Sequence, residues 1–183
     1  MLSGIIPRVI ALGYAVLLLI AVVVSDKSVL AQAAESNEPV AVMEIGGAAS
    51  RSVTNHESSY GPTVAVETTA IERWLELEAG VTPLFGHHST EWSTDLLFKK
   101  PWTLSHRAEF MIGAGPEWIH TNARNSAANS VAIEVAPDFM FWPKAHHRFG
   151  WYVEPGYEYK FGRDHEHSFA ITGGLLIGVG KRR

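Results

Sequence analysis

Hydrophobic and polar residues alternate along most of the chain after Ala34. The clearest stretch is 131–136, in which the odd positions are Val, Ile and Val and the even positions are Ala, Glu and Ala. A period of two is typical of β-strands whose two faces meet different surroundings. Helical spacing is not sustained anywhere in this part of the chain, so the pattern predicts an all-β protein.

The alternation recurs often enough to predict about eight strands, each of about ten residues, which is the length of a strand that crosses a membrane. We expect an antiparallel up-and-down barrel over residues 34–183. The strands are expected around residues 41–47, 64–67, 75–78, 95–98, 107–115, 131–136, 148–160 and 169–179.

The segments between the strands predict the orientation of the barrel. Outer-membrane barrels have short periplasmic turns and longer outer loops. We expect longer connections at 50–59, 82–90 and 120–129, an intermediate one at 162–166, and short turns at 68–73, 99–101 and 143–147. Residues 50–59 and 120–129 would then face outside, and 99–101 and 143–147 would face the periplasm.

Aromatic residues gather near both ends of the expected strands. Rings at the two membrane–water interfaces are typical of membrane barrels. The expected outer girdle contains Trp92, Trp118, Tyr157 and Tyr159, and the expected periplasmic girdle contains Trp102, Trp151, Phe141 and Phe149.

A soluble lipocalin-like barrel is the alternative, because it also alternates but keeps its apolar face inside. The polar face here mixes Glu and Asp with Gly and Ala and holds few Lys, which suits a narrow filled interior. Substitutions in one strand test this choice. Ile133→Lys places a cation in hydrocarbon, whereas Glu134→Leu is expected to leave an interior cation unpaired only in the membrane barrel.

The first segment has the features of a secretory signal peptide. Arg8 precedes a long apolar run that ends at Val24, and Ala31-Gln32-Ala33 gives a small-x-small cleavage pattern. We expect residues 1–33 to be a signal peptide that is cleaved after Ala33, with an uncleaved membrane anchor as the alternative. Either interpretation predicts export.

Composition narrows the function classes further. The 183 residues contain no cysteine, which excludes a disulfide framework and a thiolate zinc site. The formal net charge is −4 and no basic stripe is visible, so nucleic acid is not an expected partner.

The chain resembles the small eight-stranded outer-membrane barrels, among them the OmpA transmembrane domain and OmpX. The resemblance covers everything after Ala34 and rests on the strand pattern, with Gly-Pro-Glu-Trp at 115–118 and Glu-Pro-Gly-Tyr-Glu-Tyr within 153–160. One departure is the end of the sequence, Gly-Lys-Arg-Arg, where such barrels usually carry an aromatic residue. The resemblance implies a bacterial outer-membrane location, lipid and lipopolysaccharide as surroundings, and a monomer.

The polar face is strongly acidic. Buried carboxylates need partners or they take up protons. We expect an interior network of ion pairs, with a cation path or a proton-linked gate as the alternative. Its carboxylates are Glu44, Glu67, Glu76, Glu78, Asp95, Glu109, Glu134, Asp138, Glu154 and Glu158, and its candidate cations are Arg107, Arg148 and Lys160.

Histidines and one serine are the remaining candidates for chemistry. Imidazoles on neighbouring loops could bind zinc or copper, but their spacing matches no ligand motif: His56, His87, His88, His120, His165 and His167. Barrel enzymes that deacylate lipopolysaccharide use a His-x-Ser pair with a carboxylate, and His87-His88-Ser89 has that spacing. In that family, however, the pair lies on a late strand.

No residue is therefore assigned as catalytic, cofactor-binding or metal-binding, and no cofactor is expected. The sequence favours a structural or surface-interaction protein of the outer membrane, with a filled polar interior and a surface ligand at the outer loops. A lipid A-modifying enzyme and a narrow channel for small solutes are the alternatives.

Overall fold

The computed structural model describes residues 39–87, 89–123, 126–144, 147–162 and 165–180. The expected signal peptide, residues 1–33, lies outside the described residues. None of the described residues belongs to a helix long and apolar enough to cross a membrane.

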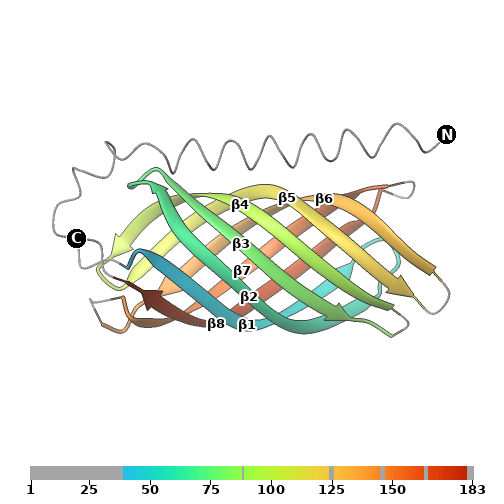
Figure 1. Cartoon of the computed structure of the whole chain (residues 1–183), viewed down its shortest axis with the longest axis horizontal. Helices are drawn as coiled ribbons and strands as arrows, with labels where there is room; N and C mark the ends of the chain where they lie inside the picture. Colours follow the sequence, from blue (N-terminus) through green and yellow to red (C-terminus); the bar gives the residue numbers. More distant parts are fainter. Residues whose placement is uncertain (1–38, 88, 124–125, 145–146, 163–164, 181–183) are drawn as a thin grey trace. The chain divides into compact units, whose positions relative to one another are not determined.

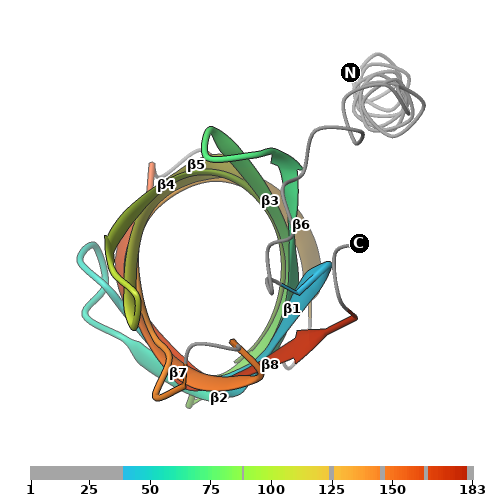
Figure 2. The same cartoon turned by 90° about the vertical axis from the view of Figure 1, so that its left-hand side faces the viewer.

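Eight antiparallel strands form one closed barrel, as the alternation predicts (Figure 1). Each strand pairs with the next along the chain, and β1 pairs with β8 from Ala41↔Val179 to Ser52↔Ser168 to close the ring seen end-on in Figure 2. Closure leaves no free edge along the paired length. The strands are β1 (Ala41–Ser52), β2 (Ser58–Ile71), β3 (Leu75–Phe85), β4 (Ser89–Ser105), β5 (Ala108–Ala123), β6 (Ser126–Phe141), β7 (Phe149–Phe161) and β8 (His167–Val179).

The outer face of the barrel is apolar. In β6, Val131, Ile133 and Val135 are each 43–44% exposed, while Ala132 and Ala136 at the alternate positions are buried. The expected girdle tryptophans also point outward and are about half exposed: Trp92, Trp102, Trp118 and Trp151. A soluble barrel would have the opposite arrangement, so the faces match a barrel that meets lipid.

The end of the lumen where β1 begins and β8 ends is filled by apolar side chains. We call this group the apolar plug, and it contains Val42, Met111, Met140, Trp142, Tyr152 and Leu176. Trp142 also stacks on the imidazole of His147, with ring centroids 4.8 Å apart and an interplanar angle of 7°. Side chains fill a barrel of eight strands in this way because its interior is narrow.

Several predicted connections are wrong because the strands run further than expected. Residues 99–101 lie inside β4, whose turn to β5 falls at 106–107, and residues 120–129 lie mostly in the β5–β6 hairpin. Pro101 is tolerated because β4 pairs with β3 only as far as Lys99↔Glu76, which leaves one edge of the strand free beyond that point.

The expected alternation of long outer loops and short periplasmic turns is also wrong. At the end opposite the termini the connections are 53–57, 86–88, 124–125 and 162–166, whereas the longest connection, 142–148, lies at the terminal end. The turns expected at 68–73 and 143–147 do lie close to the observed connections 72–74 and 142–148. The positions of the two chain ends and of the aromatic girdles therefore indicate the orientation of the barrel better than the loop lengths do.

Candidate functional site

The half of the lumen next to the apolar plug contains a group of charged side chains around one lysine. Lys99 extends inward from β4, and its ammonium group is completely buried above the apolar plug. Its position follows from the period of two, since residues 93, 95, 97 and 99 share the inner face of β4. A buried ammonium needs anionic partners, and four strands supply them.

Four carboxylates contact the Lys99 Nζ, and we call this group the inner lysine cluster. Nζ lies 2.5 Å from Glu154 Oε2, 3.1 Å from Asp138 Oδ2 and 3.8 Å from Glu67 Oε2, and it also contacts Glu78 Oε2. All five side chains are at most 8% exposed. One ammonium thus ties together β2, β3, β4, β6 and β7.

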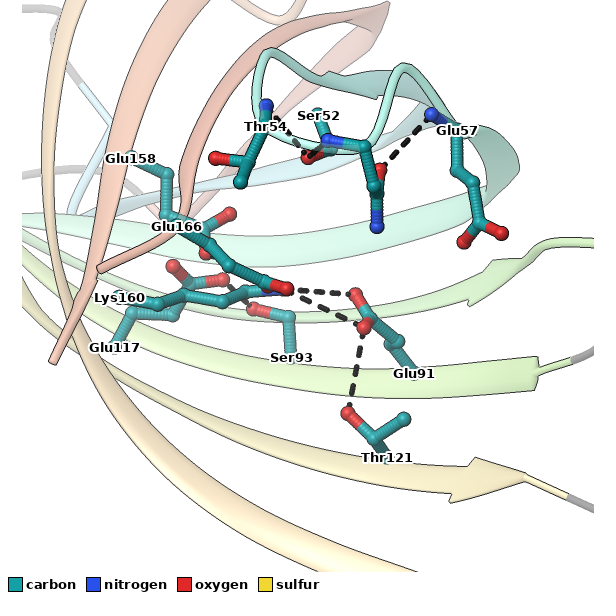
Figure 3. Close-up of polar contacts among 11 residues, drawn as sticks. Ser52, Thr54, Glu57, Glu91, Ser93, Glu117, Thr121, Glu158, Lys160 and Glu166 are labelled. Atoms are coloured by element: carbon teal, nitrogen blue, oxygen red, sulfur yellow. Dashed lines mark hydrogen bonds and ion pairs between the residues drawn. The ribbon is translucent and has the colours of Figure 1, made fainter. Parts of the chain in front are cut away.

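A second lysine organises the mouth of the lumen at the loop end. Lys160 Nζ lies 3.2 Å from Glu91 Oε2, 3.7 Å from Glu158 Oε1 and 3.9 Å from Glu166 Oε2 (Figure 3). We call these four residues the outer lysine cluster. Its side chains are between 11% and 36% exposed, so water reaches this cluster more easily than the inner one.

A small polar cavity lies between the two clusters. Its volume is about 50 Å³, and its lining includes Glu44 and Glu78 from the inner region and Glu158 from the mouth. Ser93 donates a hydrogen bond to Glu117 Oε1 beside it (Figure 3). A cavity of this size holds a few water molecules.

Two glycines make room for carboxylates on the cavity wall. A Cβ at Gly80 would lie 2.7 Å from Asp95 Oδ1, and a Cβ at Gly156 would lie 2.8 Å from Glu134 Oε1. Real Cβ atoms do not approach so closely. The side chains of Asp95 and Glu134 therefore lie against the backbone of the neighbouring strand and form part of the cavity wall.

Most of the predicted interior carboxylates do point into the lumen. Six of them are buried there: Glu44, Glu67, Glu78, Asp138, Glu154 and Glu158. Glu76 and Glu109 lie nearer the terminal rim, where Thr69 Oγ1 donates to Glu76 Oε1 and His147 Nδ1 lies 3.6 Å from Glu109 Oε1.

The predicted cations are only partly right. Lys160 takes part in the outer lysine cluster, but Arg107 and Arg148 are exposed at the terminal end, where Arg148 lies over the ring of Phe149. The expectation that Glu134 pairs with a cation is also wrong. The charged groups that act most strongly on Glu134 are carboxylates: Glu117, Glu154, Asp95 and Glu158.

Sequence reasoning missed Lys99 and Glu117. Lys99 was assigned to a turn because Lys100 and Pro101 follow it, although the alternation that starts at Asp95 already places it on the inner face. Glu117 continues the inward series of β5 that begins at Met111. Extending the period of two up to the residues before Pro101 finds Lys99, and extending it past Pro116 finds Glu117.

The loop histidines do not form a metal site within the described residues. His120 Nδ1 is hydrogen-bonded to Asn129 Oδ1 at 2.7 Å, and the Tyr159 and Tyr157 hydroxyls bond to Nδ1 of His165 at 2.6 Å and of His167 at 2.5 Å. The one described group with metal-ligand spacing consists of carboxylates: Glu44, Glu67, Glu78 and Asp138.

The candidate His-x-Ser pair lies between β3 and β4. Ser89 begins β4 and lines a polar pocket at the mouth together with Glu57, Glu91 and Glu166, while His87 is exposed in the connection and His88 lies outside the described residues. Ser89 therefore has carboxylates nearby but faces the lumen side of the mouth. That position lies on the opposite side of the sheet from the outward apolar face, on which a lipid-modifying enzyme of this kind would meet acyl chains.

Comparison with known proteins identifies the fold. No protein-family model matches the chain, and no curated protein matches its sequence. The crystal structure of Neisserial surface protein A (NspA) is similar, with a TM-score of 0.64 and 10% identity over 75% of this chain and 96% of that one.

Two other solved barrels are similar as well. The N-terminal β-barrel domain of Pseudomonas aeruginosa OprF has a TM-score of 0.54 and 12% identity over 76% of this chain and 98% of that one. Ail of Yersinia pestis, in complex with the heparin analogue sucrose octasulfate, has a TM-score of 0.51 and 12% identity over 76% of this chain and 99% of that one. The chain therefore has the fold of the small eight-stranded outer-membrane β-barrels.

Proposed function

We propose that this protein is an outer-membrane barrel that interacts with other molecules at the cell surface through residues 126–130 of its β5–β6 hairpin. The outward apolar face and the two girdles support the membrane location. Both ends of the described barrel lie at the plugged end, which in an even-stranded barrel of this kind is the periplasmic end. The hairpin at the opposite end then reaches outside (Figure 1).

The observation that carries the interaction is an unpaired strand edge. Residues 126–130 of β6 pair with β5, from Ser126↔Ala123 to Ser130↔Ile119. Pairing of β6 with β7 begins only at Val131↔Phe161, so no described residue covers the other edge of this segment. An exposed edge is a template for an added strand, and proteins use it to bind extended peptides.

The filled lumen favours this role over the channel. A solute would have to pass both the inner lysine cluster and the apolar plug, in which Met111, Met140 and Trp142 are at most 2% exposed. Eight-stranded barrels are generally too narrow to hold an open path. We expect no stepwise conductance from the purified protein in planar lipid bilayers.

The mouth is acidic, which influences the choice of partner. Glu57, Glu91, Glu158 and Glu166 surround the mouth, with Lys160 among them. The Ail structure contains a sulfated sugar analogue, but a polyanion would be repelled here. The partner proposed for this barrel is an extended polypeptide segment.

Location and orientation can be tested with single cysteines, since the chain has none of its own. Asn55→Cys in the 53–57 connection should react with a membrane-impermeant thiol reagent on whole cells, and His106→Cys in the opposite turn should react only after lysis. A mobility shift on gels after boiling checks that each variant is folded. Equal labelling of both sites on whole cells would contradict the membrane assignment.

The interaction can be tested by selecting peptides from a random display library against the barrel in micelles. Selected peptides should be extended, strand-forming sequences, and they should lose binding when residues 121–128 are replaced by a two-residue Asn-Gly turn. Tyr60→Ala, on the exposed face of β2, which pairs with neither β5 nor β6, is the control and should not change binding. If the selected peptides bind the unmodified barrel and the variant without residues 121–128 equally well, the hairpin edge is not the binding site.

A further inference from the structure

Four buried carboxylates from four strands converge inside the barrel. Glu44 of β1, Glu67 of β2, Glu78 of β3 and Asp138 of β6 each offer an oxygen, and these oxygens all lie within 4.8 Å of one another. Each of the four residues is at most 3% exposed. The group is held by the sheet itself, because each side chain sits at an inward position of a strand paired on both sides.

The positive charge in this region does not match the negative charge. Lys99 is the ammonium that contacts the group, and Glu154 brings the number of surrounding carboxylates to five. Lys99 contacts Oε2 of Glu67 and Glu78 and Oδ2 of Asp138. Carboxylates that are buried without a cation are strongly unfavourable, so this region needs either protons or a second cation.

Two oxygens are available to such a cation. Glu44 Oε1 and Asp138 Oδ1 are buried, and neither has a hydrogen-bond partner in the described structure. Lys99 contacts neither atom. Buried acceptors without a partner are rare, and an ion that has not been placed is one of their ordinary explanations.

The cavity gives a small ion a way in from the mouth as far as two of the four carboxylates, Glu44 and Glu78. Glu44 and Glu78 line its inner part, and Ser50, Glu158 and Ala170 line the part nearer the loop end. Its volume of about 50 Å³ exceeds the 10–15 Å³ that about one water molecule needs. An ion could therefore enter from the mouth with a few water ligands.

We propose that Glu44, Glu67, Glu78 and Asp138 form a divalent-cation site of the Ca²⁺ class beside Lys99. Carboxylate oxygens suit hard cations, whereas zinc and copper favour nitrogen and sulfur. Ca²⁺ binds oxygens at about 2.3–2.6 Å, so opposite ligands stand about 4.6–5.2 Å apart, which matches the spacing of this group. The ion would share Glu67, Glu78 and Asp138 with Lys99, would bind the unpartnered oxygens Glu44 Oε1 and Asp138 Oδ1, and would cross-link β1, β2, β3 and β6.

The test is calorimetric titration of the purified, folded barrel in an uncharged detergent, free of lipopolysaccharide, with Ca²⁺. We expect saturable binding of about one ion per chain, and Ca²⁺ should raise the urea midpoint of unfolding by mass action. Glu44→Gln should weaken binding by about tenfold or more, because it removes charge at the ligand itself. Heat-modifiability on gels checks folding, and Asp138→Asn replaces Glu44→Gln if that variant does not fold.

Two further variants make the result specific. Glu166→Gln removes a carboxylate of similar charge from the outer lysine cluster and should leave Ca²⁺ affinity unchanged. Lys99→Met should bind Ca²⁺ more tightly, because it removes a positive charge next to the ion. Absence of binding by the unmodified barrel would overturn the proposal, as would equal losses in Glu44→Gln and Glu166→Gln, which would indicate a diffuse interaction with the acidic mouth.

Discussion

The two lysine clusters in the lumen have similar chemistry but different surroundings. Lys99 is fully buried among carboxylates that are at most 8% exposed, whereas Lys160 is 12% exposed and contacts Glu166, which is 36% exposed. Both lysines come from inward positions of their strands. The difference arises from depth, because Lys99 lies directly above the apolar plug and Lys160 lies at the mouth.

This difference determines what each lysine contributes. Breaking a buried ion pair leaves an uncompensated charge in a low-dielectric region, while an ion pair near water is easily replaced by hydration. The inner cluster should therefore hold the barrel together, and the outer cluster should mainly shape the electrostatic character of the mouth. Four substitutions test this comparison and the assignment of the two faces.

Lys99→Ala should have the largest effect. It removes the one ammonium shared by Glu78, Asp138 and Glu154, and loss of one partner from a buried ion pair costs about 3–5 kcal/mol. Urea unfolding in micelles, followed by tryptophan fluorescence, measures this loss of stability. A change below about 1 kcal/mol, the value typical of exposed pairs, would show that the inner cluster is not a buried network.

Ile133→Lys should have the next largest effect. Ile133 lies on the outward face of β6, and a cation at the midplane on the lipid side of such barrels costs about 2–4 kcal/mol. Unfolding from liposomes measures it. Thr90→Lys, which is beyond the outer girdle on β4, is the matched control and should be nearly neutral; equal losses would contradict the position of the membrane.

Lys160→Ala should have a small effect on stability. Partly exposed ion pairs contribute about 0–1 kcal/mol each, and water can hydrate Glu91 and Glu166 once the ammonium is gone. The same urea experiment compares it directly with Lys99→Ala. If Lys160→Ala lowers the free energy of unfolding as much as Lys99→Ala does, the two clusters do not differ in their contribution to stability.

Glu134→Gln should have the smallest effect. The charged groups that act most strongly on Glu134 are carboxylates, so removing this charge reduces repulsion and leaves no cation unpaired. We expect a change within about 0.5 kcal/mol in either direction. For the same reason Glu134→Leu no longer distinguishes a membrane barrel from a soluble one. A loss of several kilocalories in the Glu134→Gln unfolding curve would reveal a cation partner of Glu134.

The alternation of the sequence was sufficient to predict the barrel and its faces. Side chains in a strand alternate between faces with a strict period of two, so Ile133 and Glu134 had to lie on opposite sides once one strand was recognised. The same rule correctly placed Glu44, Glu67 and Glu154 inside. These predictions depend only on local geometry, which is why they needed no knowledge of pairing.

Predictions that depended on strand ends were less accurate. Residues 99–101 and 120–129 carry turn-forming types such as Lys-Pro and Asn-Ala-Ser. Cross-strand pairing nevertheless extends β4 through 99–101, β5 as far as Ala123 and β6 from Ser126. Local propensity is a weak influence compared with hydrogen bonding to a neighbouring strand. The long outer loops were inferred from those ends and were wrong with them. The alternation placed Arg107 and Arg148 on the polar face, but both lie at the terminal end of the barrel, where their side chains are exposed.

The sequence by itself determined that this chain forms a closed antiparallel barrel with an apolar outside and an acidic inside. The face on which each side chain lies follows directly from its position in the period-two alternation. Only the tertiary structure decided which charges meet. Lys99 and Glu154 are 55 positions apart in the chain, and their contact depends on the register of every strand between them. Register is a property of the whole closed sheet, so the inner lysine cluster and the proposed cation site appear only once the ring is complete.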